Sequence, residues 1–256
     1  MDKTLLKGLA VLEAVAGNDG PPRTIDELAA QLQLTRSNVH RTLQTLAHAG
    51  YVVRDEMSGN YRSTLRLFEL GARQVARFDV RKYAPPFMRL LAEQTGETVH
   101  LSVLDGIDVI YLDKIDSPQP IRSYTAIGGR APAYAVATGK ALLAVQPDGY
   151  LARYESAIQR HTPATLASLP ALKDEMQKIT RLGYALNCGE WRESVGGVAV
   201  AIFDAMDQPV AALGISGPME RLTPARMEEL APLVRKYAAE VSRAMGYRDG
   251  YFRKTA

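Results

Sequence analysis

Side chains that can hydrogen-bond to bases and phosphates are concentrated between residues 35 and 62. Arginine, asparagine, glutamine and serine are side chains that pair with base edges or phosphates in a major groove. At about 100° per residue, Ser37, Arg41 and Gln44 project from the helix face opposite Val39 and Leu43. This pattern predicts a helix that packs with one side and binds DNA with the other. The residues expected to contact an operator in double-stranded DNA are Thr35, Arg36, Ser37, Asn38, His40, Arg41, Gln44, Arg54 and Arg62.

Two helices are expected to come before this one. Apolar residues at helical spacing predict a first helix that ends at the run 17–22, which is rich in glycine, proline and asparagine. A second helix should begin at Thr24, because Thr24 and Glu27 match a capping box. The third helix begins at Thr35, only a few residues after the second ends. Two short helices joined by such a turn are typical of a helix-turn-helix.

Residues 51–54 and 61–64 predict two strands joined by a polar hairpin tip. Arg54 and Arg62 lie on these strands, where they could contact the phosphate backbone beside the groove. A helical pair with a solvated polar face is the alternative interpretation. Three helices, a tight turn and a basic hairpin in this order favour a winged helix-turn-helix DNA-binding domain over residues 1–65.

Composition limits the class of protein. The chain has 256 residues and 46% hydrophobic residues, which suits two folded domains. The single cysteine, Cys188, excludes an intramolecular disulfide. The sequence has neither a signal peptide nor an apolar run of membrane-spanning length, so we expect a cytoplasmic protein with no membrane partner. The formal net charge of +3 is too small to indicate nucleic-acid binding. The stretch from Arg36 to Arg66 is locally basic, however, because it contains five arginines and only two acidic residues.

Residues 66–80 predict a linker helix that also serves dimerisation. Its apolar edge, which includes Leu67 and Leu70, would be exposed on an isolated winged-helix domain. Helix-turn-helix proteins usually bind two half-sites as symmetric dimers. We therefore expect a homodimer.

Residues 81–256 predict an α+β domain with an antiparallel sheet flanked by helices. Pro85-Pro86 should start its first helix, and Thr223 should cap a long final helix. The runs expected to form strands are 98–104, 109–113, 121–125, 184–188, 197–203 and 209–216. The other expected helices lie near 135–145, 150–156 and 170–182.

Catalytic patterns are weak in this domain. Gly139-Lys140 lacks the upstream glycine of a phosphate loop, and Pro218 replaces the last glycine of a nucleophile elbow. His100 is expected to be a hydrogen-bonded core residue, and no histidines are paired at metal-ligand spacing. We predict no enzyme activity, no metal and no cofactor. The alternatives are an effector-independent architectural DNA binder and a ligand-transforming enzyme fused to a DNA-binding domain.

The whole chain resembles the IclR family of bacterial transcription regulators. The stretches that carry the resemblance are Ser37 to Leu43, Gly129 to Pro132 leading to Gly139 to Ala144, and Gly214 to Pro218. The resemblance implies a GAF-like C-terminal domain that binds a small effector, and dimers that often pair into tetramers. It also implies control of a nearby catabolic operon, by repression or activation.

In that family a small carboxylate occupies a pocket of the C-terminal domain. The matching positions here are Ser123, Ala131, Ala137, Thr138, Asn187, Val195, Gly197, Gly214 and Ser216. Members that sense glyoxylate or pyruvate carry a carboxylate, a cysteine and a serine where this chain has Asn187, Gly197 and Gly214, so we expect a larger pocket here. The hypothesis is an aromatic or longer organic acid, with Tyr124 and Trp191 as neighbours.

Each of these positions also has a structural interpretation. The two glycines would serve close packing of strands, and Asn187 would satisfy a turn. Arg122 and Arg130 are candidate counter-charges for an acid, and Arg130 is included among the expected effector-binding residues. Either arginine could equally lie on the surface or at an interface.

Overall fold

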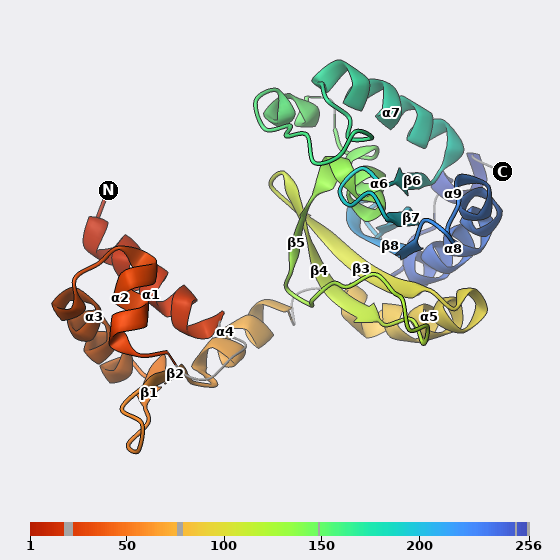
Figure 1. The fold of residues 1–256 in the computed structure, drawn as a ribbon. Coiled ribbons are helices and arrows are strands. Elements are labelled where there is room, and N and C mark those ends of the chain that lie inside the picture. Colours follow the sequence, from red (N-terminus) through yellow and green to blue (C-terminus); the bar gives the residue numbers. More distant parts are fainter. Residues whose placement is uncertain (18–22, 76–78, 148, 249, 255–256) are drawn as a thin grey trace. The chain divides into compact units, whose positions relative to one another are not determined.

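The computed structural model describes residues 1–17, 23–75, 79–147, 149–248 and 250–254. The chain forms two compact units, Met1–Arg77 and Phe78–Ala256, each with its own core (Figure 1). Of the predicted linker 66–80, residues 66–75 form one helix and residue 80 begins the next, whereas 76–78 lie outside the described residues. None of the described helices is long and apolar enough to cross a membrane.

The N-terminal unit is a three-helix cluster followed by a two-stranded antiparallel hairpin and a further helix. Thr24 caps the second helix: the Glu27 backbone N–H donates to the Thr24 hydroxyl, and the Thr24 N–H donates to the Glu27 carboxylate. Gln33 adopts a left-handed conformation with φ of 53°, which turns the chain into the third helix. The elements are α1 (Lys3–Ala16), α2 (Ile25–Leu32), α3 (Arg36–His48), β1 (Val52–Arg54), β2 (Tyr61–Ser63) and α4 (Arg66–Val75).

The C-terminal unit contains a six-stranded antiparallel sheet with the order β5-β4-β3-β8-β7-β6. The predicted α+β class with an antiparallel sheet is therefore confirmed. The strands are β3 (Thr98–Asp105), β4 (Asp108–Ile115), β5 (Arg130–Pro132), β6 (Ala185–Cys188), β7 (Val195–Phe203) and β8 (Pro209–Pro218). The helices are α5 (Val80–Thr95), α6 (Ala137–Leu143), α7 (Leu169–Leu182), α8 (Pro224–Ala244) and α9 (Tyr251–Lys254), with 3-10 turns η1 (Ala133–Ala135) and η2 (Tyr150–Tyr154).

Helices cover both faces of the sheet (Figure 1). On one face, large aliphatic residues such as Leu101 and Leu213 pack against α5 and α8. On the other face, small residues such as Ala199 and Ala212 pack beneath η1, α6 and α7. Because successive side chains of a strand point to opposite faces, His100 and Ser216 lie on the second face, beside α6.

Several predictions about this unit were wrong. Residues 121–125, expected as a strand, belong to no strand, because side chains hold that segment: Arg221 donates to the Ile121 carbonyl and Lys114 to the Thr125 carbonyl. Pro85 and Pro86 do not start a helix but lie inside α5, which begins at Val80. The helix expected near 150–156 is the 3-10 turn η2, and residues 130–132, which are not among the expected strands, form β5.

Candidate nucleic-acid interface and effector cavity

The exposed face of α3 holds the side chains that sequence analysis assigned to DNA. Val39 and Leu43 are fully buried against α1 and α2, whereas Ser37, Arg41 and Gln44 are exposed. His40 is exposed on a flank of the same helix, and Asn38 is half-buried. The Arg41 Nη2 donates to Asn38 Oδ1 at 3.4 Å, which directs the guanidinium along the exposed face.

Two of the expected DNA-contacting residues also have structural roles. Thr35 is the N-cap of α3, and its hydroxyl accepts from the Asn38 backbone N–H at 3.3 Å. Arg36 pairs with Asp26 of α2, and both side chains are about two thirds exposed. Such exposed pairs contribute little to stability, so Arg36 stays available to phosphate.

The hairpin of β1 and β2 presents two arginines. Arg62 is exposed on β2, opposite Val53, and Arg54 is exposed on β1, opposite Tyr61. Arg54 Nε donates to the Gly59 carbonyl at 3.2 Å, so this side chain crosses the hairpin tip. Hydrogen bonds from Ser58, then from Met57, keep the pKa of Asp55 below its usual range. The hairpin therefore carries the negative charge of Asp55 among its arginines.

The C-terminal unit contains a cavity of about 270 Å³ between the sheet, α6 and two loops. Neutral hydrogen-bonding groups and small apolar side chains dominate its lining, and one arginine contributes to it. The lining residues are His100, Tyr111, Ser123, Tyr124, Thr125, Val136, Ala137, Thr138, Asn187, Trp191, Arg192, Ser194, Val195, Gly197, Ile215 and Ser216.

His100 and Ser216 form the polar centre of this cavity. His100 Nε2 lies 2.7 Å from Ser216 Oγ, and Nδ1 lies 3.4 Å from Thr125 Oγ1. Burial, reinforced by the nearby charge of Lys114, lowers the pKa of His100 to about 4. Burial also raises the pKa of Tyr111 to about 12. Both rings are neutral near pH 7, so they can orient a ligand by hydrogen bonds without adding charge.

Most of the predicted effector-binding residues line this one cavity: Ser123, Tyr124, Ala137, Thr138, Asn187, Val195, Gly197 and Ser216. Three do not line it. Arg130 is exposed and pairs with Asp105 and Asp108, and Ala131 is buried in β5 opposite Val109. A Cβ at Gly214 would meet Ala199 Cβ at 2.7 Å. Gly214 therefore serves close packing and does not enlarge the cavity.

Comparisons with known proteins cover both units. Residues 4–56 match the IclR helix-turn-helix domain, and residues 72–243 match the bacterial transcriptional regulator IclR C-terminal domain. The chain is 35% identical over 250 residues to the HTH-type transcriptional regulator KdgR of Escherichia coli K12, covering 96% of this chain and 94% of that protein.

The fold agrees with solved structures. The Thermotoga maritima IclR crystal structure has 32% identity and a TM-score of 0.79, and the match covers 95% of this chain and 99% of that one. An IclR homologue from Microbacterium hydrocarbonoxydans, solved in complex with 4-hydroxybenzoate, has 23% identity and a TM-score of 0.80, with 95% and 99% coverage.

The chain belongs to the IclR family of bacterial transcriptional regulators. As an IclR protein it is a DNA-binding regulator with an effector-binding C-terminal domain, and not an enzyme. The winged helix-turn-helix and the cavity described above are the parts of the chain suited to these two tasks.

Sequence reasoning missed several residues of the IclR cavity. His100 was expected to be a core residue, and it is buried and hydrogen-bonded but also lines the cavity. Arg192 supplies the arginine of the lining, whereas Arg122 and Arg130 do not line it. The Arg192 guanidinium lies 4.7 Å from the centroid of the Trp191 ring. Its position directly after Trp191, a residue expected near the ligand, was the sequence signal that could have identified Arg192.

Protonation of His100 predicts a pH-dependent stability. In an unfolded chain a histidine has a pKa of about 6.5, so below that pH the unfolded state takes up a proton that the folded state refuses. Neutral His100 therefore contributes to the free energy of unfolding above about pH 6.5, and this contribution is lost as pH falls through about 4. Its full size is about 3 kcal/mol.

The measurement is the free energy of unfolding of the C-terminal unit by urea between pH 4 and 7. His100→Gln keeps a hydrogen-bonding side chain but does not titrate, so we expect a smaller loss of stability toward acid. An identical pH slope in both proteins would contradict the assignment.

Proposed function

We propose that this IclR regulator binds an operator through α3 and the β1–β2 hairpin, and that an organic acid larger than pyruvate modulates this binding from the C-terminal cavity. The observation that carries the proposal is the cavity itself, which combines a single arginine with neutral donors and acceptors. Arg192 offers a counter-charge to a carboxylate. His100, Ser123 and Ser216 offer hydrogen bonds to the remainder of the ligand.

Ligand size follows from the volume. A cavity of about 270 Å³ has space for more heavy atoms than glyoxylate or pyruvate contain. Tyr111 and Trp191 provide ring surfaces, and hydroxyl groups provide polar contacts. We therefore propose an aromatic acid or a longer acid that carries hydroxyl groups. The 4-hydroxybenzoate bound by the Microbacterium hydrocarbonoxydans homologue has both features, which makes it a suitable first probe.

We also propose that the regulator acts as a homodimer, which can pair into a dimer of dimers. Large apolar side chains are exposed in the N-terminal unit: Leu5 and Leu9 on α1, Leu65 directly before α4, and Phe68 in its first turn. A second copy would remove this surface from water. Two DNA-binding domains would then bind two half-sites, as helix-turn-helix dimers do.

The test of the function is a genome-wide footprint of the purified protein, with and without each member of a panel of acids. The panel contains glyoxylate, pyruvate, benzoate, 4-hydroxybenzoate and gluconate. We expect a palindromic site beside a catabolic operon whose occupancy changes with one of the larger acids. Binding that no acid alters would favour an effector-independent architectural protein. A response to pyruvate or glyoxylate at lower concentration than to any larger acid would contradict the size argument.

Ser216→Ala should weaken the binding of the acid that the panel selects. A hydrogen bond between uncharged groups contributes about 0.5–1.5 kcal/mol, so we expect Kd to rise roughly 2- to 13-fold. Calorimetry on the full-length protein measures the change. Ser156→Ala, at an exposed position of the same unit, is the control and should leave Kd unchanged. Equal affinities in the two variants would remove Ser216 from the proposed site.

A further inference from the structure

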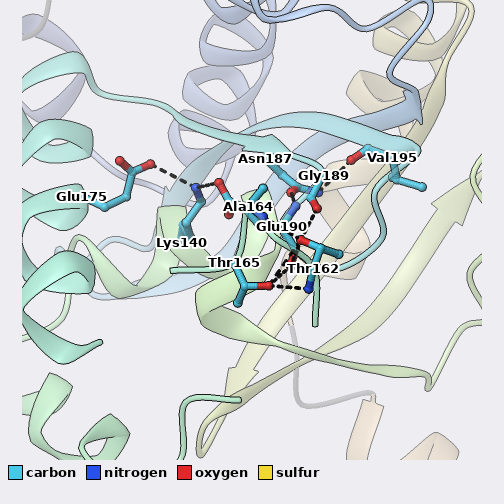
Figure 2. Close-up of polar contacts among 9 residues, drawn as sticks. All are labelled: Lys140, Thr162, Ala164, Thr165, Glu175, Asn187, Gly189, Glu190 and Val195. Carbon is cyan, nitrogen blue, oxygen red and sulfur yellow. Dashed lines mark hydrogen bonds and ion pairs between the residues drawn. The ribbon is translucent and has the colours of Figure 1, made fainter. Parts of the chain in front are cut away.

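A lysine with no exposed surface lies beneath one wall of the cavity. Lys140, on α6, is 0% exposed, and its Nζ lies 2.7 Å from Glu190 Oε1 and 3.0 Å from Glu175 Oε1 (Figure 2). Glu190 is 8% exposed, and among the described residues its Oε2 has no hydrogen-bond partner. Lys140 is thus the cation that compensates this buried carboxylate.

This ion pair contributes little net free energy to the stability of the fold. The cost of taking two charges out of water offsets most of their attraction, and apolar replacements of similar volume are often equally stable. One oxygen of Glu190 has no hydrogen-bond partner in the described part of the chain, which adds to the cost. The arrangement therefore suggests a role in fixing one conformation.

The segment fixed by Glu190 is a tight loop between β6 and β7. The Glu190 N–H donates to Asn187 Oδ1 at 3.0 Å, and the Glu190 carbonyl accepts from the Thr165 hydroxyl at 2.6 Å (Figure 2). The Gly189 carbonyl accepts from the Thr162 hydroxyl at 2.7 Å. Gly189 has φ of 78°, and a Cβ there would meet the Glu193 carbonyl oxygen at 2.8 Å. The loop is closed on itself and is attached to the domain through the Gly189 carbonyl, the Glu190 carbonyl and carboxylate, and the Ser194 carbonyl, which accepts from the Met219 N–H at 2.8 Å. The Glu190 carboxylate supplies the charged attachment among these.

The same loop forms a wall of the cavity. Trp191 and Arg192 follow Glu190 directly and line the cavity, as do Ser194 and Val195 further along. Asn187 lines it as well, and its amide is occupied by the loop: Oδ1 accepts from Glu190, and Nδ2 donates to the Val195 carbonyl at 3.4 Å. A shift of Glu190 must therefore move the ring and the cation that face the ligand.

We propose that Lys140 and Glu190 are positioning residues of the effector site, whose ion pair sets the placement of Trp191 and Arg192 without touching the ligand. The ligand argument rests on the proposed function, whereas the placement of the loop does not. When supporting residues of this kind are removed in metal sites, affinity falls by about 10- to 100-fold. We expect a loss on that scale in the affinity for the acid.

Trp191 is the only tryptophan of the chain, so its fluorescence reports on this wall alone. The test compares Glu190→Gln with Glu175→Gln in the full-length, ligand-free protein. Both substitutions remove one carboxylate from Lys140, but only Glu190 belongs to the loop. Glu193→Gln, at an exposed loop position outside the cavity lining, is the second control. The readouts are the emission maximum of Trp191 and its quenching by acrylamide and iodide, with circular dichroism as the check of folding.

We expect Glu190→Gln to shift the emission to longer wavelength and to increase quenching, because the half-buried ring becomes more exposed. Both controls should match the parent protein. No change in Glu190→Gln, or an equal change in Glu175→Gln, would overturn the proposal. If Glu190→Gln does not fold, the double variant Lys140→Met with Glu190→Met decides: a folded protein with altered Trp191 quenching supports the proposal, and unaltered quenching overturns it.

These readouts need no effector. If no acid binds the parent protein, the proposed function fails while the fluorescence result still decides the role of the ion pair. Once the panel has selected an acid, its Kd in Glu190→Gln, measured against Glu175→Gln, tests the consequence for binding. An unchanged Kd in a variant with a displaced Trp191 would overturn the positioning role.

Discussion

Arg41→Ala is expected to weaken operator binding by about 1–3 kcal/mol per half-site, or roughly 5- to 150-fold, and to leave binding to random DNA nearly unchanged. Arg41 is exposed on α3, on the face opposite the buried Val39 and Leu43. An arginine that reads a base edge adds affinity only where that base is present. A dimer would suffer the loss at both half-sites, so the total change in affinity is the product of the two.

Two other arginines provide the comparison. Arg62, exposed on β2, is expected to contact phosphate, so Arg62→Ala should weaken operator and random DNA alike and reduce the salt dependence of binding. Arg181→Ala, at an exposed position of the C-terminal unit, should change neither. Affinities for both DNAs over a series of salt concentrations separate the three cases. An equal loss on both DNAs for Arg41→Ala would remove its role as a base reader.

The N-terminal unit was predictable because its determinants are local. The capping box of Thr24 and Glu27 spans four residues, and the N-cap of Thr35 reaches only to Asn38. The buried and exposed faces of α3 follow from a helical period that neighbouring residues define. Gly50 follows α3 in the left-handed conformation that glycine commonly adopts after a helix, with φ of 79°.

The cavity was only partly predictable because its remaining determinants are distant in sequence. Residues 121–125 include Ile121, Tyr124 and Thr125, which favour strands, but their conformation depends on Arg221 and Lys114. Lys140 meets Glu190 across 50 residues, and neither residue type is expected inside a core. The bulkier-ligand hypothesis assumed that glycine creates space. At Gly214 the neighbouring Ala199 and Thr138 already fill it.

Gly139→Ala is expected to destabilise the C-terminal unit by at least about 3 kcal/mol, because the added Cβ has no space. It would lie 2.2 Å from the Ala133 carbonyl oxygen and 2.4 Å from Ala133 Cα, both backbone atoms of η1. Nothing lies within 4 Å of a Cβ at Gly8, in the middle of α1. There the same substitution should stabilise the N-terminal unit by about 0.5–1 kcal/mol, since alanine favours a helix over glycine.

The measurement is calorimetric unfolding of both variants, with the two units followed as separate transitions. The effect of Gly139→Ala should extend to the ligand, because Ala137 and Thr138 of the same helix line the cavity. Separating α6 from η1 would displace them, so binding of the selected acid should be lost while the transition of the N-terminal unit stays in place. A C-terminal transition unchanged by Gly139→Ala would mean that α6 does not pack on η1 as closely as described. The placement of Ala137 and Thr138 in the cavity wall, which depends on that contact, would then be wrong.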